Sequence, residues 1–124
     1  MEYNNNQPIY LQIADIFCDN ILQKKWMEDD KIPSIRDIAV EMEVNPNTVL
    51  RTYNHLQDSG IIFNKRGLGY FVSPGGLQRT RMLKKEQFFN IDLPLFFKTL
   101  NSLEISVEEI TNLYSIFKQD KNNS

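Results

Sequence analysis

Apolar positions in the first half of the chain recur at helical spacing in two segments that follow each other closely. The first segment runs from Ser34 to Glu41, and Ser34 suits the position of an N-cap. After a brief break, Asn45 and Pro46 suit the start of a second helix, because the missing N–H of proline costs nothing at the first helical position. Gly60 suits its end. This order predicts a helix-turn-helix.

The second predicted helix has an apolar and a polar side. The buried side is expected to consist of Val49, Tyr53 and Leu56. The polar side is expected to consist of Thr48, Arg51, Thr52 and His55, with Asn45 and Asn47 at the N-terminus. Free N–H groups at a helix N-terminus can bind phosphate, and Arg and Asn can bond guanine and adenine through two hydrogen bonds. These residue types suit a helix that reads the major groove, although any surface helix also has a polar face.

Two β-prone runs follow, at 61–63 and 70–72, and a polar turn with glycines separates them. The turn contains Lys65, Arg66 and Gly67. Its basic side chains would reach the sugar-phosphate backbone or the minor groove, and glycine permits turn dihedrals there. An ordinary hairpin with a solvated turn is the alternative. Because the hairpin comes directly after a helix-turn-helix, we predict that it is a wing.

An earlier helix is predicted over about 8–24. Its apolar residues, Tyr10, Ile13, Phe17 and Ile21, are expected to pack on Ile38, Val49, Tyr53 and Leu56. Cys18 is the only cysteine of the chain and lies inside this helix, where a buried, reduced thiol is expected. A disulfide within one chain and a cysteine-rich zinc site are therefore excluded, and we expect no metal and no cofactor.

The region after Pro74 has a different pattern, in which apolar residues recur mostly at three- and four-residue steps. These residues are Met82, Phe89, Leu93, Phe96, Leu100 and Leu103. Pro94 removes one backbone hydrogen bond and disfavours helical geometry at Leu93, which predicts a kink or a restart near 90–92. A final helix is predicted to begin at Ser106, which can form a capping box with Glu109.

Five of the eight phenylalanines lie in this tail, which is more than two or three short helices can bury. We therefore expect a twofold dimer interface in the tail. Its expected residues are Phe89, Leu93, Phe96, Phe97, Leu100, Ile110, Leu113, Tyr114 and Phe117. The alternative is that the tail folds back on its own winged helix.

Three motifs within about 8–73 resemble the winged helix-turn-helix of GntR-type bacterial transcription regulators. They are Pro33-Ser34-Ile35-Arg36, Asn45-Pro46-Asn47-Thr48-Val49 and Arg66-Gly67-Leu68-Gly69, the last followed by Tyr70-Phe71-Val72. The resemblance implies DNA contacts at Ser34, Arg36, Asn45, Asn47, Thr48, Arg51, Lys65, Arg66 and Gly67. The tail resembles the short helical extension of the YtrA-like branch, which lacks the large effector-binding domain of other members.

The predicted fold class is mainly α with a small β-hairpin, with a winged helix-turn-helix at 1–75 and a two- to three-helix dimerisation tail at 76–124. The predicted function is that of a homodimeric, sequence-specific transcription regulator, expected to be a repressor. Its expected partner is double-stranded DNA with a near-palindromic operator, since a twofold dimer presents two reading helices one helical turn apart. The resemblance also implies control of a neighbouring transporter operon. The sequence identifies no effector and predicts no ligand pocket.

Charge complicates this reading, because residues 1–75 hold seven Lys and Arg against ten Asp and Glu, a net charge of −3. From Val44 to Gly75, however, the segment contains three basic residues and only one acidic residue, Asp58. So few phosphate-neutralising groups per subunit imply modest non-specific affinity, and tight binding should need two subunits and a matched site. A winged-helix module that binds protein instead of DNA stays open as an alternative.

Other classes fit the sequence poorly. His55 is the only histidine and has no cysteine partner for catalysis, and the carboxylates scatter over polar faces, so we do not expect an enzyme. The first residues lack a basic start with an apolar core, and nowhere do 18 apolar residues run together. We therefore expect no membrane partner and a cytoplasmic location.

Overall fold

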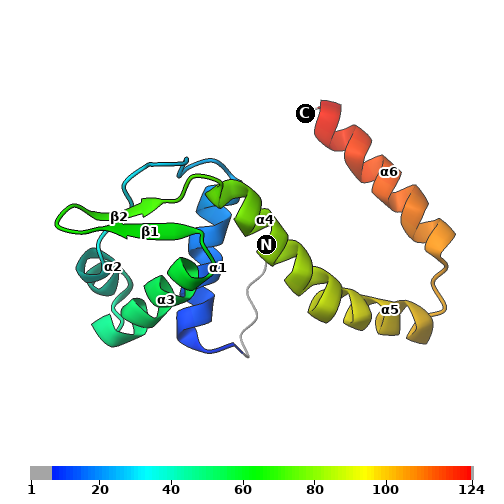
Figure 1. The fold of residues 1–124 in the computed structure, drawn as a ribbon. Coiled ribbons are helices and arrows are strands. Elements are labelled where there is room, and N and C mark those ends of the chain that lie inside the picture. Colours follow the sequence, from blue (N-terminus) through cyan, green and yellow to red (C-terminus); the bar gives the residue numbers. More distant parts are fainter. Residues whose placement is uncertain (1–6, 124) are drawn as a thin grey trace. The chain divides into compact units, whose positions relative to one another are not determined.

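The computed structural model describes residues 7–123, and they form two compact units that meet between Lys84 and Lys85 (Figure 1). The first unit contains α1 (Ile9–Leu22), α2 (Ile35–Met42), α3 (Pro46–Asp58), β1 (Ile62–Lys65), β2 (Gly69–Val72) and most of α4 (Gly76–Gln87). The second contains the end of α4, a π-helical turn (Phe88–Asp92), α5 (Leu93–Ser102) and α6 (Val107–Asn123). The predicted fold class, mainly helical with a small hairpin, is confirmed.

Capping hydrogen bonds between neighbouring residues determine where the two helices of the helix-turn-helix begin. The Ser34 hydroxyl accepts the backbone N–H of Asp37 at 3.0 Å, and the Asp37 carboxylate accepts the Ser34 N–H, which completes a capping box. Glu43 ends α2 in the left-handed conformation, with φ of 55°. Asn45 then caps α3, and Pro46 occupies its first turn as predicted.

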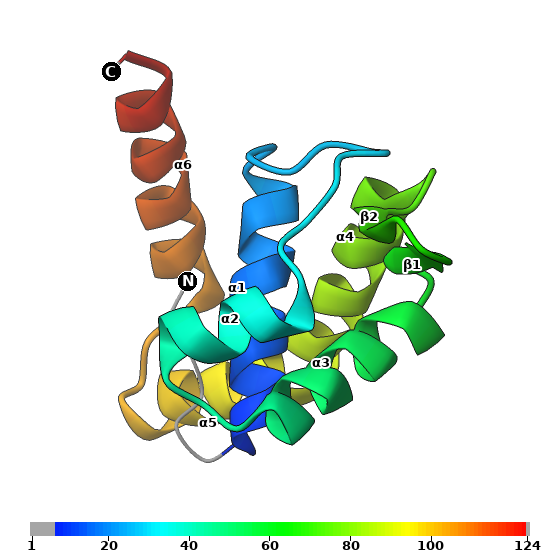
Figure 2. The same cartoon turned by 90° about the vertical axis from the view of Figure 1, so that its left-hand side faces the viewer.

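The core of the first unit forms where α3 packs on both α1 and α2 (Figure 2). Its side chains come from all three helices and from the hairpin: Ile13, Phe17, Ile21, Ile38, Val49, Tyr53, Leu56, Ile61, Ile62 and Val72 are buried. Trp26, after α1, packs edge-on against Phe17 with ring centroids 4.9 Å apart. Tyr10, expected in the core, is only half-buried.

The hairpin pairs β1 and β2 antiparallel, from Ile62 opposite Val72 to Lys65 opposite Gly69. On its other edge, β2 bonds to the segment before α2: Ile32 donates to the Tyr70 carbonyl and Asp29 to the Val72 carbonyl. Both edges of β2 are therefore paired, which holds the hairpin against the helical core.

The start of α4 packs closely on the hairpin. A Cβ at Gly76 would lie 2.9 Å from the Ile61 carbonyl oxygen, so this position has no room for a side chain. Leu77 and Leu83 pack against the core of the first unit. The first turns of α4 are thus part of the winged-helix unit, although the sequence assigned them to the tail.

One ion pair joins α4 to α1. Lys84 donates to the Asp15 carboxylate at 2.8 Å, and the two side chains are only 13% and 11% exposed. An ionised carboxylate at this depth needs its partner, because burial of an unpaired charge is costly. The pair therefore favours the docked position of α4.

Lys84→Met is expected to lower the free energy of unfolding by about 2–3 kcal/mol, since it leaves Asp15 buried without its cation. Urea unfolding should measure the loss, and the exposed neighbour Lys85 provides the control: Lys85→Met should stay within about 0.5 kcal/mol of the wild type. Adding Asp15→Leu to Lys84→Met should restore most of the loss. Equal effects of the two single lysine variants would contradict this role.

The second unit begins with the predicted irregularity before Pro94. The N–H of Leu93 donates to the carbonyl of Phe88, five residues earlier, and the helix widens into a π-turn over Phe88–Asp92. Leu93 itself is helical, with φ of −65° and ψ of −45°. The predicted disturbance is confirmed, but non-helical geometry at Leu93 was wrong, because the π-turn accommodates the missing proline donor without breaking the helix.

The end of α5 explains the position of Leu100. Glu104 is left-handed, with φ of 55°, and the N–H of Ile105 donates to the Leu100 carbonyl at 2.9 Å. This is the Schellman arrangement, in which the residues corresponding to Ile105 and Leu100 make an apolar contact. Leu100 is accordingly buried, at 7% exposed. Its predicted place at a dimer interface is therefore corrected, because Leu100 is already buried in the single chain.

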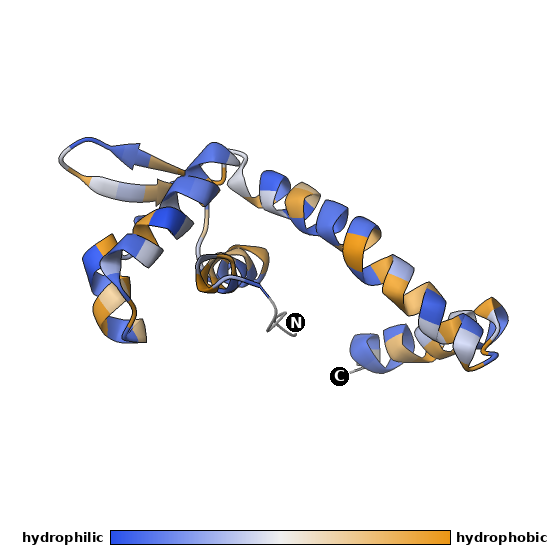
Figure 3. Ribbon diagram, turned by 90° about the horizontal axis from the view of Figure 1, so that it is seen from below, coloured by the Kyte–Doolittle hydropathy of each residue, from blue (hydrophilic) through white to orange (hydrophobic). Residues whose placement is uncertain are grey.

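The last helix, α6, begins with the predicted capping box between Ser106 and Glu109. Its described side chains are all exposed except Ile110, which is half-buried. Hydrophobic positions nevertheless recur along the tail helices (Figure 3). Large apolar side chains of the tail are exposed at Phe88, Phe89, Ile91, Leu95, Phe96, Phe97, Leu103, Val107, Leu113, Tyr114, Ile116 and Phe117. Among the described residues, no helix has the length and apolar character to cross a membrane.

Candidate nucleic-acid interface

The exposed face of α3 consists of Asn47, Leu50, Arg51 and Asn54, which are spaced at three and four residues. The predicted polar face was wrong in one position: Thr52 is fully buried. Its hydroxyl donates to the backbone carbonyl of Tyr10 at 2.7 Å and so joins α3 to α1. The short hydroxyl allows Thr52 to occupy the apolar side of the helix, because its hydrogen bond is satisfied there.

Arg51 is held in place by an aromatic ring. Its guanidinium carbon lies 4.3 Å from the centroid of the Tyr10 ring, within the range of a cation–π contact. His55 packs edge-on against the same ring, with centroids 6.2 Å apart. The ring of the half-buried Tyr10 thus limits the rotamers of Arg51, while Arg51 itself stays exposed.

Asn45 and Asn47, two of the predicted DNA-contacting residues, differ in the hydrogen bonds that their side chains make at the N-terminus of α3. The Asn45 side-chain oxygen accepts the N–H of Asn47 at 2.8 Å, which uses one of its lone pairs and fixes the Asn45 amide against the helix N-terminus. Asn47 is exposed, and its side-chain amide makes no hydrogen bond within the described residues. Since bidentate bonding to adenine needs both amide atoms, Asn47 is better suited to it than Asn45. Thr48, beside them, is half-buried.

The start of α2 contributes the other predicted polar positions. Arg36 and Ser34 are both exposed. The Ser34 oxygen is occupied as the cap of α2, but its hydroxyl hydrogen can still be donated to a phosphate. Arg36, the second residue of α2, has its guanidinium available for a phosphate or a base edge.

The basic residues of the hairpin lie at the end of β1 and in the turn that joins β1 to β2. Lys65 lies over the stacked rings of Phe63 and Phe71, with its ammonium nitrogen 4.9 Å from the Phe71 centroid. Arg66 and Gly67 follow in the exposed turn, where Gly67 has φ of 80°. A non-glycine residue at this φ is strained, so Gly67 has a conformational role in the turn.

Two buried ionisable groups lie apart from this surface. Burial raises the pKa of Cys18 to about 12, so the thiol stays protonated and unreactive near neutral pH. Burial also raises the pKa of Tyr53, whose hydroxyl donates to the Pro33 carbonyl. Both groups are part of the core, and no group of His, Cys, Asp and Glu in the described part of the chain could hold a metal ion.

The structure therefore brings the sequence-predicted residues of the helix-turn-helix and the hairpin into one winged module. Sequence reasoning missed Leu50 and Asn54, which share the exposed face of α3 with Arg51. The spacing of Asn47, Asn54 and Arg51 could have indicated Asn54. Leu50 gave no such indication, because an apolar residue in a helix is normally assigned to the core; it is 41% exposed.

Comparison with known proteins assigns this module to a family. Residues 9–72 match the model of the bacterial regulatory proteins of the gntR family. The chain belongs to the gntR family. A protein from Bacteroides thetaiotaomicron whose crystal structure is described as that of a GntR-family transcriptional regulator is similar over 92% of this chain and 99% of its own, with 45% identity and a TM-score of 0.76. Similarity to this GntR protein thus extends through most of the tail.

Two further matches cover mainly the winged helix. The HTH-type transcriptional repressor YtrA of Bacillus subtilis is 38% identical over 69 residues, which are 56% of this chain and 53% of YtrA. The DNA-binding domain of AraR, solved in complex with an operator, is 25% identical, with a TM-score of 0.54 over 59% of this chain and 88% of that one. The chain spans about half to three fifths of the length of the curated relatives it matches.

Proposed function

We propose that this GntR-family chain is a sequence-specific DNA-binding transcription regulator that acts as a homodimeric repressor in the cytoplasm. The observation that carries the proposal is the exposed face of α3, on which Arg51 is already positioned by Tyr10. Because the Arg51 guanidinium is already held in place, less side-chain entropy is lost when it binds a partner. This favours a role of the face in recognition over that of a surface that contacts only solvent. That YtrA is named a repressor and that AraR was solved with an operator supports the same function.

The proposed contacts follow from the geometry of the module. The N-terminal half of α3 would enter the major groove, where Asn47, Arg51 and Asn54 reach base edges. Leu50, exposed between them, would contact the methyl group of a thymine. Asn45, Thr48 and Ser34 would bond phosphate oxygens and fix the register of the helix in the groove.

The basic positions outside α3 would add phosphate contacts. Arg36 would meet the backbone beside the major groove, and Lys65, Arg66 and Gly67 would meet the backbone or the minor groove next to it. Because each such contact releases counterions, affinity should fall steeply with salt. The small number of basic groups also explains why we propose two subunits per operator, with half-sites about 34–36 Å apart on a near-palindrome.

The proposal includes a tail-mediated dimer of winged helices, in which the second unit, from Lys85 onward, provides the dimer interface. Exposed apolar side chains of the π-turn, α5 and α6 are expected to be covered by a second copy. By analogy with the YtrA-like branch, we propose a neighbouring transporter operon as the regulated target. The test is a footprint on DNA upstream of the chain's own gene at moderate salt. Failure to protect an inverted repeat there would refute the proposal.

The double variant Arg36→Ala, Arg51→Ala is expected to weaken operator binding by about 100-fold or more, because each arginine bound to a base or phosphate contributes about 1–3 kcal/mol. Fluorescence anisotropy with a labelled operator would measure it. The variant should keep the unfolding midpoint and the sedimentation behaviour of the wild type, since both side chains are exposed. A double variant of the exposed Lys25 and Lys85 to alanine provides a control of equal charge change. Unchanged DNA binding in the arginine variant would favour a protein-interaction module.

A further inference from the structure

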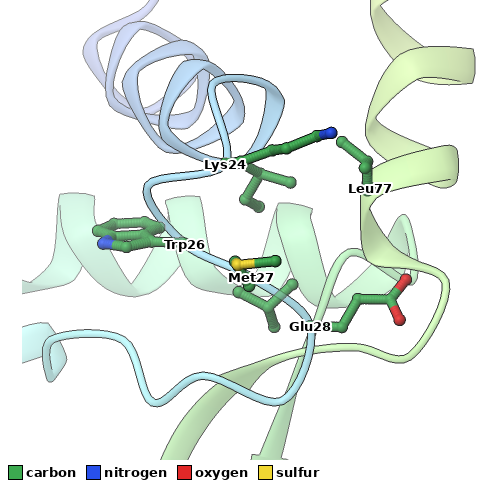
Figure 4. A pocket seen from close by; sticks show the side chains of 7 residues that line it. Lys24, Trp26, Met27, Glu28 and Leu77 are labelled. Atoms are coloured by element: carbon green, nitrogen blue, oxygen red, sulfur yellow. The ribbon is translucent and has the colours of Figure 1, made fainter.

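A pocket of about 300 Å³ lies in the first unit, on the side of α1 where the chain turns toward α2. It is lined by Ile21, Lys24, Trp26, Met27, Glu28, Val72 and Leu77 (Figure 4). These residues come from the end of α1, the following turn, the end of β2 and the first turn of α4. The pocket is of the size and mostly apolar character of small-ligand sites, and no residue proposed to contact DNA lines it.

The pocket has an apolar part and a charged part. Ile21 and Val72 are buried beneath it, and the half-buried Trp26 ring, packed on Phe17, gives it a rigid aromatic wall. Figure 4 shows the Lys24 ammonium and the Glu28 carboxylate toward Leu77, with Trp26 on the opposite side and Met27 between. A ligand in this site would therefore have an apolar body toward Trp26 and a polar head toward α4.

The two charges are opposite but do not neutralise each other. No ion pair joins Lys24 to Glu28 or to any other residue that the structure describes. Glu28 uses one carboxylate oxygen to accept the N–H of Gly75 at 2.8 Å, and its other oxygen can accept from a ligand. The pocket thus offers one cation and one anion on its Leu77 side, which complements a head group that carries both charges.

The backbone conformation of Lys24 supports a specific role for its side chain in the pocket. Its φ is 61°, in the left-handed region that a side chain beyond Cβ adopts only at a cost of about 1–2 kcal/mol. The turn brings this strained residue to the pocket, where its side chain contributes the cation.

The geometry points to a binding site for a small zwitterion with an apolar side chain, of the class of the aliphatic and aromatic α-amino acids. The carboxylate of the ligand would bind the Lys24 ammonium, its ammonium would bind the free Glu28 oxygen, and its side chain would lie against Trp26 and Met27. The head group would contact the entry to α4, where Glu28 bonds Gly75 and Leu77 lines the pocket. This inference does not depend on DNA binding.

Trp26 allows a direct test, because it is the only tryptophan of the chain. In a ¹⁵N-correlated NMR spectrum its indole N–H gives one signal, which should shift saturably with L-leucine, with half-saturation at about 1 mM for a ligand of this size. 4-Methylpentanoate lacks the ammonium, leucinamide lacks the carboxylate and glycine lacks the side chain. Each of the three should bind at least about tenfold more weakly than leucine.

Variants separate this site from non-specific contact. Lys24→Met and Glu28→Gln should each weaken leucine binding at least about tenfold, and Glu28→Gln keeps an oxygen for the Gly75 N–H. Lys25→Met, a change at the exposed neighbour that does not line the pocket, should leave binding unchanged. The rest of the spectrum reports that each variant is folded. The inference is overturned if leucine gives no saturable shift up to about 20 mM, if the analogues bind as well as leucine, or if Lys24→Met behaves as Lys25→Met does.

Discussion

Tyr53→Ala is expected to lower the free energy of unfolding by about 3–5 kcal/mol, a large part of the stability of a domain of this size. Tyr53 is fully buried, and its ring packs edge-on against Phe17 and Tyr70, with centroids 5.4 and 4.7 Å away. Alanine would leave a cavity between α1, α3 and the hairpin and would also leave the Pro33 carbonyl without its donor. The midpoint of urea unfolding, followed by circular dichroism, would measure the loss.

Two further variants divide this effect into its parts. Tyr53→Phe keeps the ring and removes only the hydroxyl that bonds Pro33, so about 1–3 kcal/mol should be lost. Asn54→Ala changes the next residue, which is exposed, and stability should change by less than about 0.5 kcal/mol. If Asn54 reads DNA as proposed, the same variant should still weaken operator binding. A loss in Tyr53→Ala no larger than in Tyr53→Phe would contradict the packing role of the ring.

Features set by neighbouring residues could be predicted from the sequence. The caps at Ser34, Asn45 and Ser106 form hydrogen bonds within three residues, so the residue types alone indicate where α2, α3 and α6 begin. The irregularity before Pro94 is similarly local, because proline lacks the donor that an α-helix needs. What the sequence could not settle was how the helix would respond: a π-turn over Phe88–Asp92 takes the place of the expected kink or restart near 90–92.

Features that depend on distant segments were missed. Thr52 appeared to belong to the polar face of α3, but the Tyr10 carbonyl, 42 residues away in the chain, gives its hydroxyl a buried partner. The Asp15–Lys84 pair and the pocket beside Trp26 likewise combine segments far apart in the sequence. Leu50 was missed for the opposite reason, since its apolar side chain faces outward. Hydrophobic periodicity identifies the face of a helix that packs on the core. Whether a residue at the edge of that face is buried depends on the other segments that pack there.

The double variant Leu113→Glu, Phe117→Glu is expected to convert the proposed dimer into a monomer of 14.6 kDa, as measured by sedimentation velocity. Both side chains lie on α6 and are 61% and 58% exposed in the single chain, so the substitutions should not disturb the fold of the chain. In a dimer they would be covered, and a buried glutamate without a partner is costly.

A matched control is available on the same helix. The double variant Asn112→Glu, Gln119→Glu adds two carboxylates at exposed polar positions of α6, and it should leave both the dimer and the unfolding midpoint unchanged. Circular dichroism would verify that the helix content of both variants equals that of the wild type. This comparison separates the loss of an interface from a general effect of negative charge on α6.

The monomeric variant should also separate the two levels of DNA recognition. Each winged helix is intact, so affinity for a duplex with one half-site should equal that of the wild type. Affinity for the full inverted repeat should fall by about 100-fold or more, because the second winged helix no longer binds at the high effective concentration that a dimer provides. A wild type that sediments as a monomer would instead favour a tail that folds back on its own winged helix. A double variant that stays dimeric would assign the interface to other residues, and the exposed phenylalanines around the π-turn, Phe88, Phe89, Phe96 and Phe97, would then be the next to replace.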